Sequence, residues 1–318
     1  MFLAKRKIKG KTYFFLEKSL RMPDGKTRKI SKVLKARPKD LSQAIEEHKD
    51  YFVQKEKKAF VAFALKNYQW KYPLSEKDIM QIEEIKVEYK RIVEKLKKEN
   101  IKDLFDRFTV NFTYESNAIE GNSLTLKDVA IVISENRTVE GKDMREIYET
   151  KNSRQAVDLL LHKKVKISHE GIIRLQKIIM QNIEKESGYK KLPNMILGSN
   201  LKTSPPEKVY QHMAELIGWY DKNRQKMHPL QLAAIFHGRF ERIHPFKDGN
   251  GRVGRFLLNA ILVNEGYPPL IIRKTQRVNY LHALHAFDQD TDIPLVRLVI
   301  EKYKSTYRSF YQIYFKYV

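Results

Sequence analysis

Twelve consecutive residues, His244 to Arg255, constrain this chain most, because they lie between two segments whose apolar residues have helical spacing. The segments Pro229 to Ile243 and Arg252 to Glu265 each carry apolar residues at intervals of three or four. A glycine and then two prolines follow the second segment and end it. We therefore predict two helices joined by a tight glycine-containing loop that opens into the second helix.

The residue types in this loop suit a phosphate site. Backbone amides at a helix N-terminus, together with the positive end of the helix dipole, attract anions. Arg252 and Arg255 are three residues apart, so they share a helix face and can grip a polyphosphate together. Asp248 beside such a site is a candidate magnesium ligand. We expect Pro245 to hold His244 extended at the loop entrance, where its imidazole can take a proton from a hydroxyl.

Each part of the loop also has an ordinary explanation when it is taken alone. A Gly-Asn-Gly is usually a turn, a histidine before proline is usually packing, and paired arginines usually form a solvated face. A loop that grips phosphate without catalysing a reaction is a further possibility. The whole set in one loop is poorly explained by any of these, so the loop predicts phosphate chemistry.

The loop resembles the signature of the Fic-domain family, His-Pro-Phe-x-Asp/Glu-Gly-Asn-Gly-Arg-x-x-Arg, and matches it at every signature position. The resemblance covers roughly Leu104 to Ile300. It implies a mainly α fold, a Fic-type helical bundle with a β-hairpin flap, and transfer of AMP from ATP to a hydroxyl side chain of a target protein. It makes His244 the general base and Asp248 the ligand of Mg²⁺. The ATP-binding residues that it implies in the loop are Asp248, Gly249, Asn250, Gly251, Arg252, Val253, Gly254 and Arg255.

Two more segments resemble parts of the family's substrate site. The stretch from Gly188 to Asn200 is apolar in the middle and bounded by turn formers, and it resembles the Fic flap, a hairpin whose edge holds the target's backbone. A helix beginning at Arg277 borders the base of the nucleotide in the family, which places Tyr280 and Asp288 at the adenine end. The flap residues assigned to ATP are Leu197, Gly198, Ser199 and Asn200.

The stretch Ser116 to Asn122 resembles the inhibitory-helix motif of many Fic proteins, Ser/Thr-x-x-x-Glu-Gly/Asn. A helix over about 105–121 ends at Gly121, so Glu120 lies at its C-terminus, where the helix dipole disfavours an anion by ~0.3–1 kcal/mol. Ser116 lies four residues back on the same face. The resemblance implies that Glu120 pairs with Arg255 and keeps it from the γ-phosphate of ATP, which is autoinhibition in cis.

Composition bounds the class of protein. Lys and Arg number 61 against 38 acidic residues, a formal net charge of +23, which favours polyanionic partners. A Lys-rich surface for solubility or heat adaptation would give the same charge. The chain has no cysteine, which excludes disulfides, thiolate catalysis and Cys-based metal sites. The first residues lack an apolar signal core, and no run approaches the ~18 apolar residues of a membrane span. We expect a soluble cytoplasmic protein with no membrane partner.

Four regions are predicted along the chain. They are a basic β-meander of two or three strands over 1–36, a helical region over 37–103, a Fic catalytic domain over 104–302, and an aromatic C-terminal helix over 303–318. Basic residues interleaved with aromatic ones in 1–36 could bind nucleic acid or an acidic partner, although an appended structural hairpin is the simpler explanation. The aromatic stripe of the last helix is typical of core or of a dimer face, so a homodimer is possible.

Other functions remain open beside an autoinhibited protein adenylyltransferase. With the same site, Glu120 could position a water so that the enzyme removes AMP from a modified target. A basic nucleic-acid-binding protein could instead use the Fic core for regulation. A metal hydrolase is disfavoured, because His228, His237 and His244 lack ligand spacing and no His-Glu-x-x-His occurs. The phosphate loop Gly-x-x-x-x-Gly-Lys-Ser/Thr of conventional ATPases is also absent.

Overall fold

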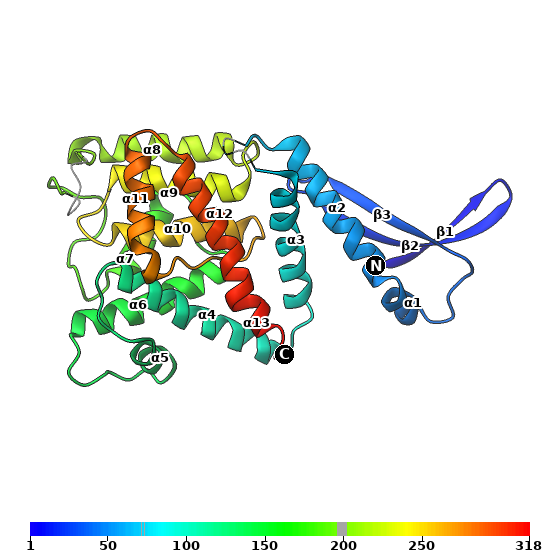
Figure 1. Ribbon diagram of the computed structural model, residues 1–318, viewed down its shortest axis with the longest axis horizontal. Helices are drawn as coiled ribbons and strands as arrows, with labels where there is room; N and C mark the ends of the chain where they lie inside the picture. The colour runs from blue at the N-terminus through cyan, green and yellow to red at the C-terminus, as the bar shows by residue number, and fades with distance from the viewer. Residues whose placement is uncertain (71, 73, 196–201) are drawn as a thin grey trace. The chain divides into compact units, whose positions relative to one another are not determined.

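A computed structural model describes residues 1–70, 72, 74–195 and 202–318 of the chain (Figure 1). The chain forms two compact units. The first unit comprises Met1–Gln69 and Pro73–Glu88, and the second comprises Trp70–Tyr72 and Tyr89–Val318. The predicted signature loop and the predicted inhibitory helix both belong to the second unit.

The first unit begins with a three-stranded antiparallel meander, as the turn signals in the sequence predict. Its strands are β1 (Phe2–Ile8), β2 (Lys11–Arg21) and β3 (Thr27–Leu34), in the order β1-β2-β3. The turn between β1 and β2 has positive φ at both of its residues, Lys9 and Gly10. Three helices follow, α1 (Leu41–Glu47), α2 (Lys49–Asn67) and α3 (Glu76–Val93), of which the last continues into the second unit.

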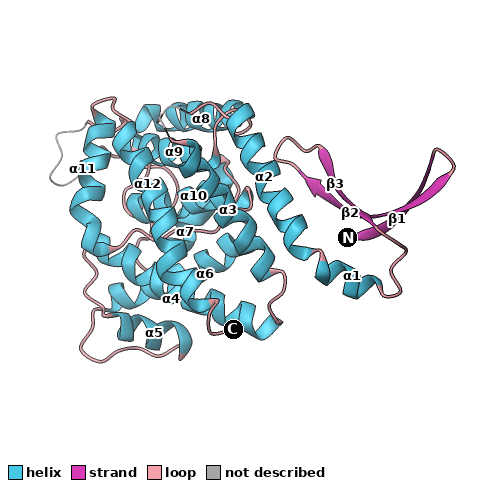
Figure 2. Cartoon of the chain, turned by 45° about the vertical axis from the view of Figure 1, so that its right-hand side comes forward, coloured by secondary structure: helices cyan, strands magenta, loops and turns pink. Residues whose placement is uncertain are grey.

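One face of this sheet packs against α2 (Figure 2). Side chains of a strand alternate between the two faces, so every second residue of β2 and β3 points toward the helix. The cluster that results is Leu16, Leu20, Met22, Ile30, Leu34, Phe52, Ala59, Phe60 and Val87. The hydrophobic face of the meander is therefore satisfied within the first unit, and its opposite face carries the intervening residues of each strand.

The second unit is helical and is built around α9 (Pro229–Ile243) and α10 (Asn250–Asn264), which pack against each other (Figure 1). Both helices are buried on almost every side, as expected of helices at the centre of a bundle. The helices in contact with α9 are α8 (Pro206–Asn223), α11 (Arg277–Asp288) and α12 (Ile293–Thr306). Those in contact with α10 on its other sides are α4 (Lys98–Ile119), α6 (Met144–Leu161) and α7 (His169–Ile179). The loop between α9 and α10 is thus fixed at both ends by the core.

The sequence predicts the ends of several helices of this unit to within a few residues. The helix α9 has the predicted bounds, and α5 (Leu126–Ser134) begins after Thr125 with the capping box that the sequence indicates. The helix α10 starts at Asn250, two residues before the predicted start. The helix α4 begins at Lys98, seven residues before Phe105. The helix predicted over 303–318 differs more, because Tyr303 lies inside α12, which begins at Ile293 and ends at Thr306. The added turns of α4 are mostly polar, so apolar spacing did not reveal them.

The aromatic residues near the C-terminus pack inside the second unit. Tyr303 and Tyr307 are buried, and a π-helical turn over Tyr307–Tyr311 leads into α13 (Gln312–Tyr314). The ring of Tyr311 lies 5.1 Å from that of Tyr89. The stripe is therefore core, and a homodimer stays a prediction that this surface does not support. None of the described helices combines the length and apolar composition that a membrane crossing requires.

Candidate active site

His244 ends α9 in the left-handed conformation, with φ 51° and ψ 60°. The extended conformation predicted for it was wrong. Pro245 does disfavour a right-handed helical residue before it, but His244 takes the left-handed alternative. In that conformation its backbone N–H still donates to the carbonyl oxygen of Phe240, at 2.9 Å, which closes the last turn of the helix. The chain therefore turns sharply at His244 and continues into the rest of the signature loop.

The next residues form a closed loop that is held by Asn250. Its side-chain oxygen accepts from the backbone N–H of Phe246 at 2.9 Å, and its amide donates to the carbonyl oxygen of the same residue at 2.7 Å. The Phe246 ring is fully buried. Gly249 has φ 83°, a left-handed value that a residue with a side chain rarely adopts. These contacts fix the loop that leads into α10.

The imidazole of His244 is neutral near pH 7. Burial lowers its pKa to about 4, although its contact with the Glu241 backbone acts in the opposite direction. Nδ1 lies 3.3 Å from the Glu241 carbonyl oxygen, so we assign the ring proton to Nδ1. Nε2 then carries a free lone pair. A neutral imidazole in this tautomer is competent to accept a proton from a hydroxyl.

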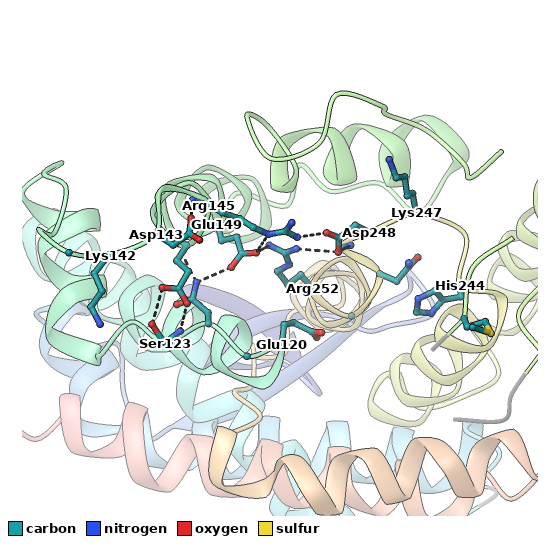
Figure 3. Close-up of a pocket in the computed structure, with 18 residues that line it drawn as sticks. Glu120, Ser123, Lys142, Asp143, Arg145, Glu149, His244, Lys247, Asp248 and Arg252 are labelled. Atoms are coloured by element: carbon teal, nitrogen blue, oxygen red, sulfur yellow. Dashed lines mark hydrogen bonds and ion pairs between the residues drawn. The ribbon is translucent and has the colours of Figure 1, made fainter. Parts of the chain in front are cut away.

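A pocket of about 790 Å³ opens beside the loop, and Figure 3 shows its lining. The predicted site residues that line it are Glu120, His244, Asp248, Gly249, Asn250, Gly251 and Arg252. The predicted residues that do not line it are Ser116, Val253, Gly254, Arg255, Tyr280 and Asp288. The flap residues assigned to ATP, Leu197, Gly198, Ser199 and Asn200, lie outside the described residues.

One wall of the pocket is a ring of alternating charges from α6 and the signature loop (Figure 3). Arg145 Nη2 lies 2.5 Å from Asp248 Oδ2, and Arg145 Nε lies 3.4 Å from Glu149 Oε1. Arg252 Nη1 lies 3.1 Å from the same Glu149 oxygen, and Arg252 Nη2 lies 3.6 Å from Asp248 Oδ1. Each carboxylate thus has two guanidinium partners. The Asp248 contacts raise the pKa of Arg145 against the opposing effect of its partial burial.

Arg255 is held by the end of α4. Its Nε donates to Ser116 Oγ at 3.0 Å, and its Nη2 donates to the Ser116 carbonyl oxygen at 2.8 Å and lies 2.8 Å from Glu120 Oε1. The arginine is 3% exposed, whereas the Glu120 side chain is 40% exposed. Burial alone would lower the pKa of Arg255, but the Glu120 carboxylate and the Tyr280 hydroxyl together outweigh this effect, and the pKa is raised. The structure thus brings together the three residues that the inhibitory motif implies.

The Glu120 carboxylate also lies against the first turn of α10. A Cβ atom added to Gly251 would collide with Glu120 Oε1, so only a glycine leaves room for this carboxylate. The N-cap residue of α10 is Gly249, which supplies no side-chain cap. The Glu120 carboxylate therefore lies beside the first turn of α10, near the positive end of the helix dipole. Its ion pair in the structure is with Arg255.

His237, Tyr280 and Glu241 form a second group of buried polar side chains. His237 Nε2 is 2.8 Å from the Tyr280 hydroxyl, and His237 Nδ1 is 3.8 Å from Glu241 Oε1. Burial raises the pKa of Glu241 to about 8 and lowers that of His237 to about 3, so both are neutral near pH 7. A Cβ atom on Gly254 would collide with Glu241 Oε1. Tyr280 is thus a buried partner of His237, and its predicted contact with adenine is untested.

Asp288 lies on α11 away from the main pocket. Its Oδ1 is 3.8 Å from Nε of Arg242, and burial raises its pKa. Val253 is fully buried in the hydrophobic side of α10. These positions neither test nor exclude the roles that the resemblance gives to the two residues.

Several residues that organise the site were missed from the sequence. Lys190 is buried, and its Nζ donates to Asn194 Oδ1 at 2.5 Å and to Thr203 Oγ1 at 2.9 Å. Asn194 in turn donates to the Phe246 carbonyl oxygen at 2.8 Å, which fastens the described part of the flap segment to the signature loop. These residues lie in irregular chain, where no periodicity marks them. The spacing of Arg145 and Glu149 is that of a helical i,i+4 pair, but the sequence shows neither the contact of Arg145 with Asp248 nor that of Glu149 with Arg252.

Comparisons with known proteins agree with this geometry. Residues 166–262 match the Fic/DOC family. A Fic-domain-containing signalling protein from Bacteroides thetaiotaomicron has a similar fold, with a TM-score of 0.65 and 28% identity over 71% of this chain and 93% of that one. A Fic family protein from Desulfovibrio desulfuricans has the same TM-score, with 26% identity over 77% of each chain. This chain contains a Fic domain.

Two curated relatives are similar over part of their length. A protein adenylyltransferase fic-1 from Caenorhabditis briggsae is 30% identical over 194 residues, which cover 59% of this chain and 38% of the relative. A protein adenylyltransferase Fic from Nematostella vectensis is 31% identical over 191 residues, covering 58% of this chain and 45% of the relative. The matched region is thus less than half of each relative.

The buried carboxyl of Glu241 predicts a pH-dependent effect of removing its charge. Its pKa is about 8 in the folded chain, above the usual value near 4.5, so the stability that its proton contributes is complete below pH 4.5 and is lost as the pH rises toward 8. Glu241→Gln stays neutral at every pH. The melting temperature of this variant relative to wild type should therefore be higher at pH 8.5 than at pH 5.

The corresponding change in the free energy of unfolding amounts to a few kcal/mol, because each pKa unit contributes about 1.4 kcal/mol. Thermal unfolding at the two pH values measures it. The exposed Glu207→Gln is the control, and its relative melting temperature should be the same at both. Equal relative melting temperatures for Glu241→Gln would contradict a neutral buried carboxyl.

Proposed function

We propose that this chain is a protein adenylyltransferase that its own Glu120 holds inactive. It transfers AMP from ATP to a Ser, Thr or Tyr hydroxyl of a target protein and releases pyrophosphate. The observation that carries the proposal is the first turn of α10, where an anion site, a neutral histidine and a buried arginine meet and a carboxylate fills the anion's place. The names of the relatives from C. briggsae and N. vectensis support the reaction.

The phosphates of ATP are assigned to the N-terminus of α10. Asn250, Gly251 and Arg252 line the pocket, and the first-turn backbone amides of α10 and the Arg252 guanidinium attract negative charge there, whereas the Gly249 N–H already donates to Asp248 Oδ1 at 2.5 Å. Arg255 is the partner of the γ-phosphate once Glu120 has left it. The adenine end is assigned to Tyr280, Asp288 and the flap residues 197–200 by family resemblance, and the target is expected to dock along the flap.

In the reaction His244 acts as the general base. Its Nε2 accepts the proton of the target hydroxyl while the hydroxyl oxygen attacks the α-phosphorus. The bond from that phosphorus to the bridging oxygen breaks, and pyrophosphate leaves with the bonding electrons. Because burial keeps His244 neutral, the base needs no prior deprotonation at pH 7. Positioning and charge neutralisation by the loop supply the remaining rate enhancement.

Magnesium fits this site through Asp248. Mg²⁺ commonly binds proteins through one or two carboxylates together with substrate phosphates, and Asp248 lies in the pocket beside the phosphate site. Among the described residues no group of three or more potential ligands forms a complete metal cage. When bound, the ion would neutralise phosphate charge. In the structure the guanidinium groups of Arg145 and Arg252 contact the Asp248 carboxylate, where the cation would bind.

The central prediction concerns transfer of label from ATP that carries radioactive α-phosphate. Glu120→Gly should raise labelling of protein, because it frees Arg255 and the first turn of α10. Adding His244→Ala to that variant should lower labelling by ~10²–10⁴-fold, the usual effect of losing a general base. Glu135→Gly is the matched control, since it removes the C-cap carboxylate of α5 and leaves Arg255 paired. Its labelling should equal that of wild type.

Two outcomes would contradict the proposal. If Glu120→Gly labels no more protein than wild type, the carboxylate does not inhibit. If wild type instead releases AMP from a labelled target and Glu120→Gly does not, the chain catalyses the reverse reaction with Glu120 positioning a water.

A second prediction concerns the cation at Asp248. Arg145→Ala removes one competing cation, so Mn²⁺, used as a paramagnetic substitute for Mg²⁺, should bind more tightly in its absence. The Arg145–Asp248 pair is partly exposed, and such pairs contribute at most about 1 kcal/mol, so the gain is up to roughly fivefold in Kd. Electron paramagnetic resonance of free Mn²⁺ measures it. Asp248→Asn should abolish binding, and Arg137→Ala, whose carboxylate partner is Glu135, should leave Kd unchanged. Unchanged Kd in Arg145→Ala would contradict the competition.

A further inference from the structure

One face of the sheet of the first unit takes no part in the core cluster of that unit. The residues of β2 that face away from α2 are Lys11, Tyr13, Phe15, Glu17, Ser19 and Arg21, and the strand register places Arg6, Lys29 and Val33 on the same face. Tyr13 and Val33 are exposed there, and so are Phe2 and Ile8 of β1. We call this surface the open face. Because the opposite face is packed on α2, the fold does not require the open face for its own core.

The open face belongs to the most basic segment of the chain. Residues 1–36 contain 12 Lys and Arg against 2 acidic residues. The two acids are Asp24, in the turn between β2 and β3, and Glu17. An excess of this size over so short a segment attracts polyanions and steers their approach.

Glu17, the acidic residue on the open face, is buried. Glu17 is 1% exposed, because Arg6 pairs with it, Ser31 Oγ donates to it at 2.9 Å, and Lys29 Nζ lies 3.9 Å away. The side chains of Arg6 and Lys29 remain about half exposed, at 46% and 59%. Glu17 therefore fixes two cations on the outer strands without presenting negative charge to a partner. Lys11 and Arg21 add exposed charge at the two ends of β2.

The geometry favours a duplex over a single strand. Single-stranded nucleic acids are held by aromatic rings on which bases stack. On the open face the Arg6 guanidinium lies over the Phe15 ring at 4.7 Å, which leaves Phe15 only 9% exposed. The exposed rings of Tyr13 and Phe2 lie on either side of the Phe15 level in the strand register, so the aromatic residues do not form a continuous row on which successive bases could stack. Neighbouring strands lie about 4.8 Å apart, so the outer strands of the sheet are about 10 Å apart. The major groove of B-DNA is about 12 Å wide and admits β-ribbons.

We propose that the open face of the β1-β2-β3 sheet binds double-stranded DNA in the major groove, with Arg6 and Lys29 on the outer strands contacting phosphates on either side. Lys11 and Arg21 contact phosphates along the direction of β2. These contacts recognise the charge and shape of the duplex and not the identity of its bases, so the binding is largely independent of DNA sequence. This function is separate from nucleotide transfer and does not depend on it.

Fluorescence anisotropy of the full chain with a labelled 20-base-pair duplex of arbitrary sequence tests the proposal. Binding should fall in the micromolar range at moderate salt, and log K should decline linearly with the logarithm of salt concentration. The variant Lys11→Gln with Arg21→Gln removes two exposed cations and leaves the Glu17 contacts intact. It should weaken binding several-fold and reduce the magnitude of the salt slope by about 2. The control is Lys222→Gln with Lys226→Gln, which removes the same charge from exposed positions of the second unit and should change neither quantity.

Competition distinguishes DNA from other polyanions. Unlabelled duplex DNA should displace the probe at lower concentration than single-stranded RNA of equal length or poly-glutamate. Tighter binding of RNA, or of poly-glutamate, would overturn the proposal in favour of an RNA or an acidic protein partner. Absence of binding, or an equal loss in the Lys222/Lys226 control, would also overturn it. The melting temperature of each variant should match wild type, which separates lost contacts from lost fold.

Discussion

The contact between Arg255 and Glu120 is the interaction on which the site depends. Arg255 is buried in α10, and a buried guanidinium without a partner costs several kcal/mol. Glu120, supplied by the end of α4, satisfies it together with two oxygens of Ser116. A phosphate of ATP can satisfy the same guanidinium, but it cannot do so while the carboxylate is there. The stabilising contact of the resting fold and the inhibitory contact of the proposed enzyme are thus one interaction.

The structure also indicates which partner moves. Arg255 is locked in the core, whereas the Glu120 side chain is 40% exposed and can turn into water, where hydration compensates for the lost ion pair. Glu120 also terminates α4, so its departure costs no helical turn, and the dipole at that end disfavours its charge. Because the same carboxylate lies against the uncapped first turn of α10, its departure frees two anion-attracting features at once.

The sequence predicted those features that are local or carried by a motif. Apolar spacing predicted the bounds of α9, residues 1–36 predicted the meander, and the inhibitory motif predicted the pairing of Glu120 with Arg255. Contacts between residues far apart in the chain were not predictable. Arg145 meets Asp248 across 103 residues, and no local pattern encodes that contact. His244 was assigned the wrong conformation, because the rule for residues before proline does not weigh the last hydrogen bond of the helix. Glu241 and His237 are visibly four residues apart, but their burial depends on the packing of α10 against α9.

Nucleotide affinity tests the central claim most directly, because the inhibitory carboxylate competes with the γ-phosphate and with nothing that AMP carries at that position. Isothermal titration calorimetry would compare ATP and AMP binding to wild type and to Glu120→Gly. We predict that ATP binds the variant at least about tenfold more tightly, or about 1.4 kcal/mol, and that AMP affinity changes less than about twofold. Unchanged ATP affinity, or an equal gain for AMP, would contradict a carboxylate that occupies the position of the γ-phosphate.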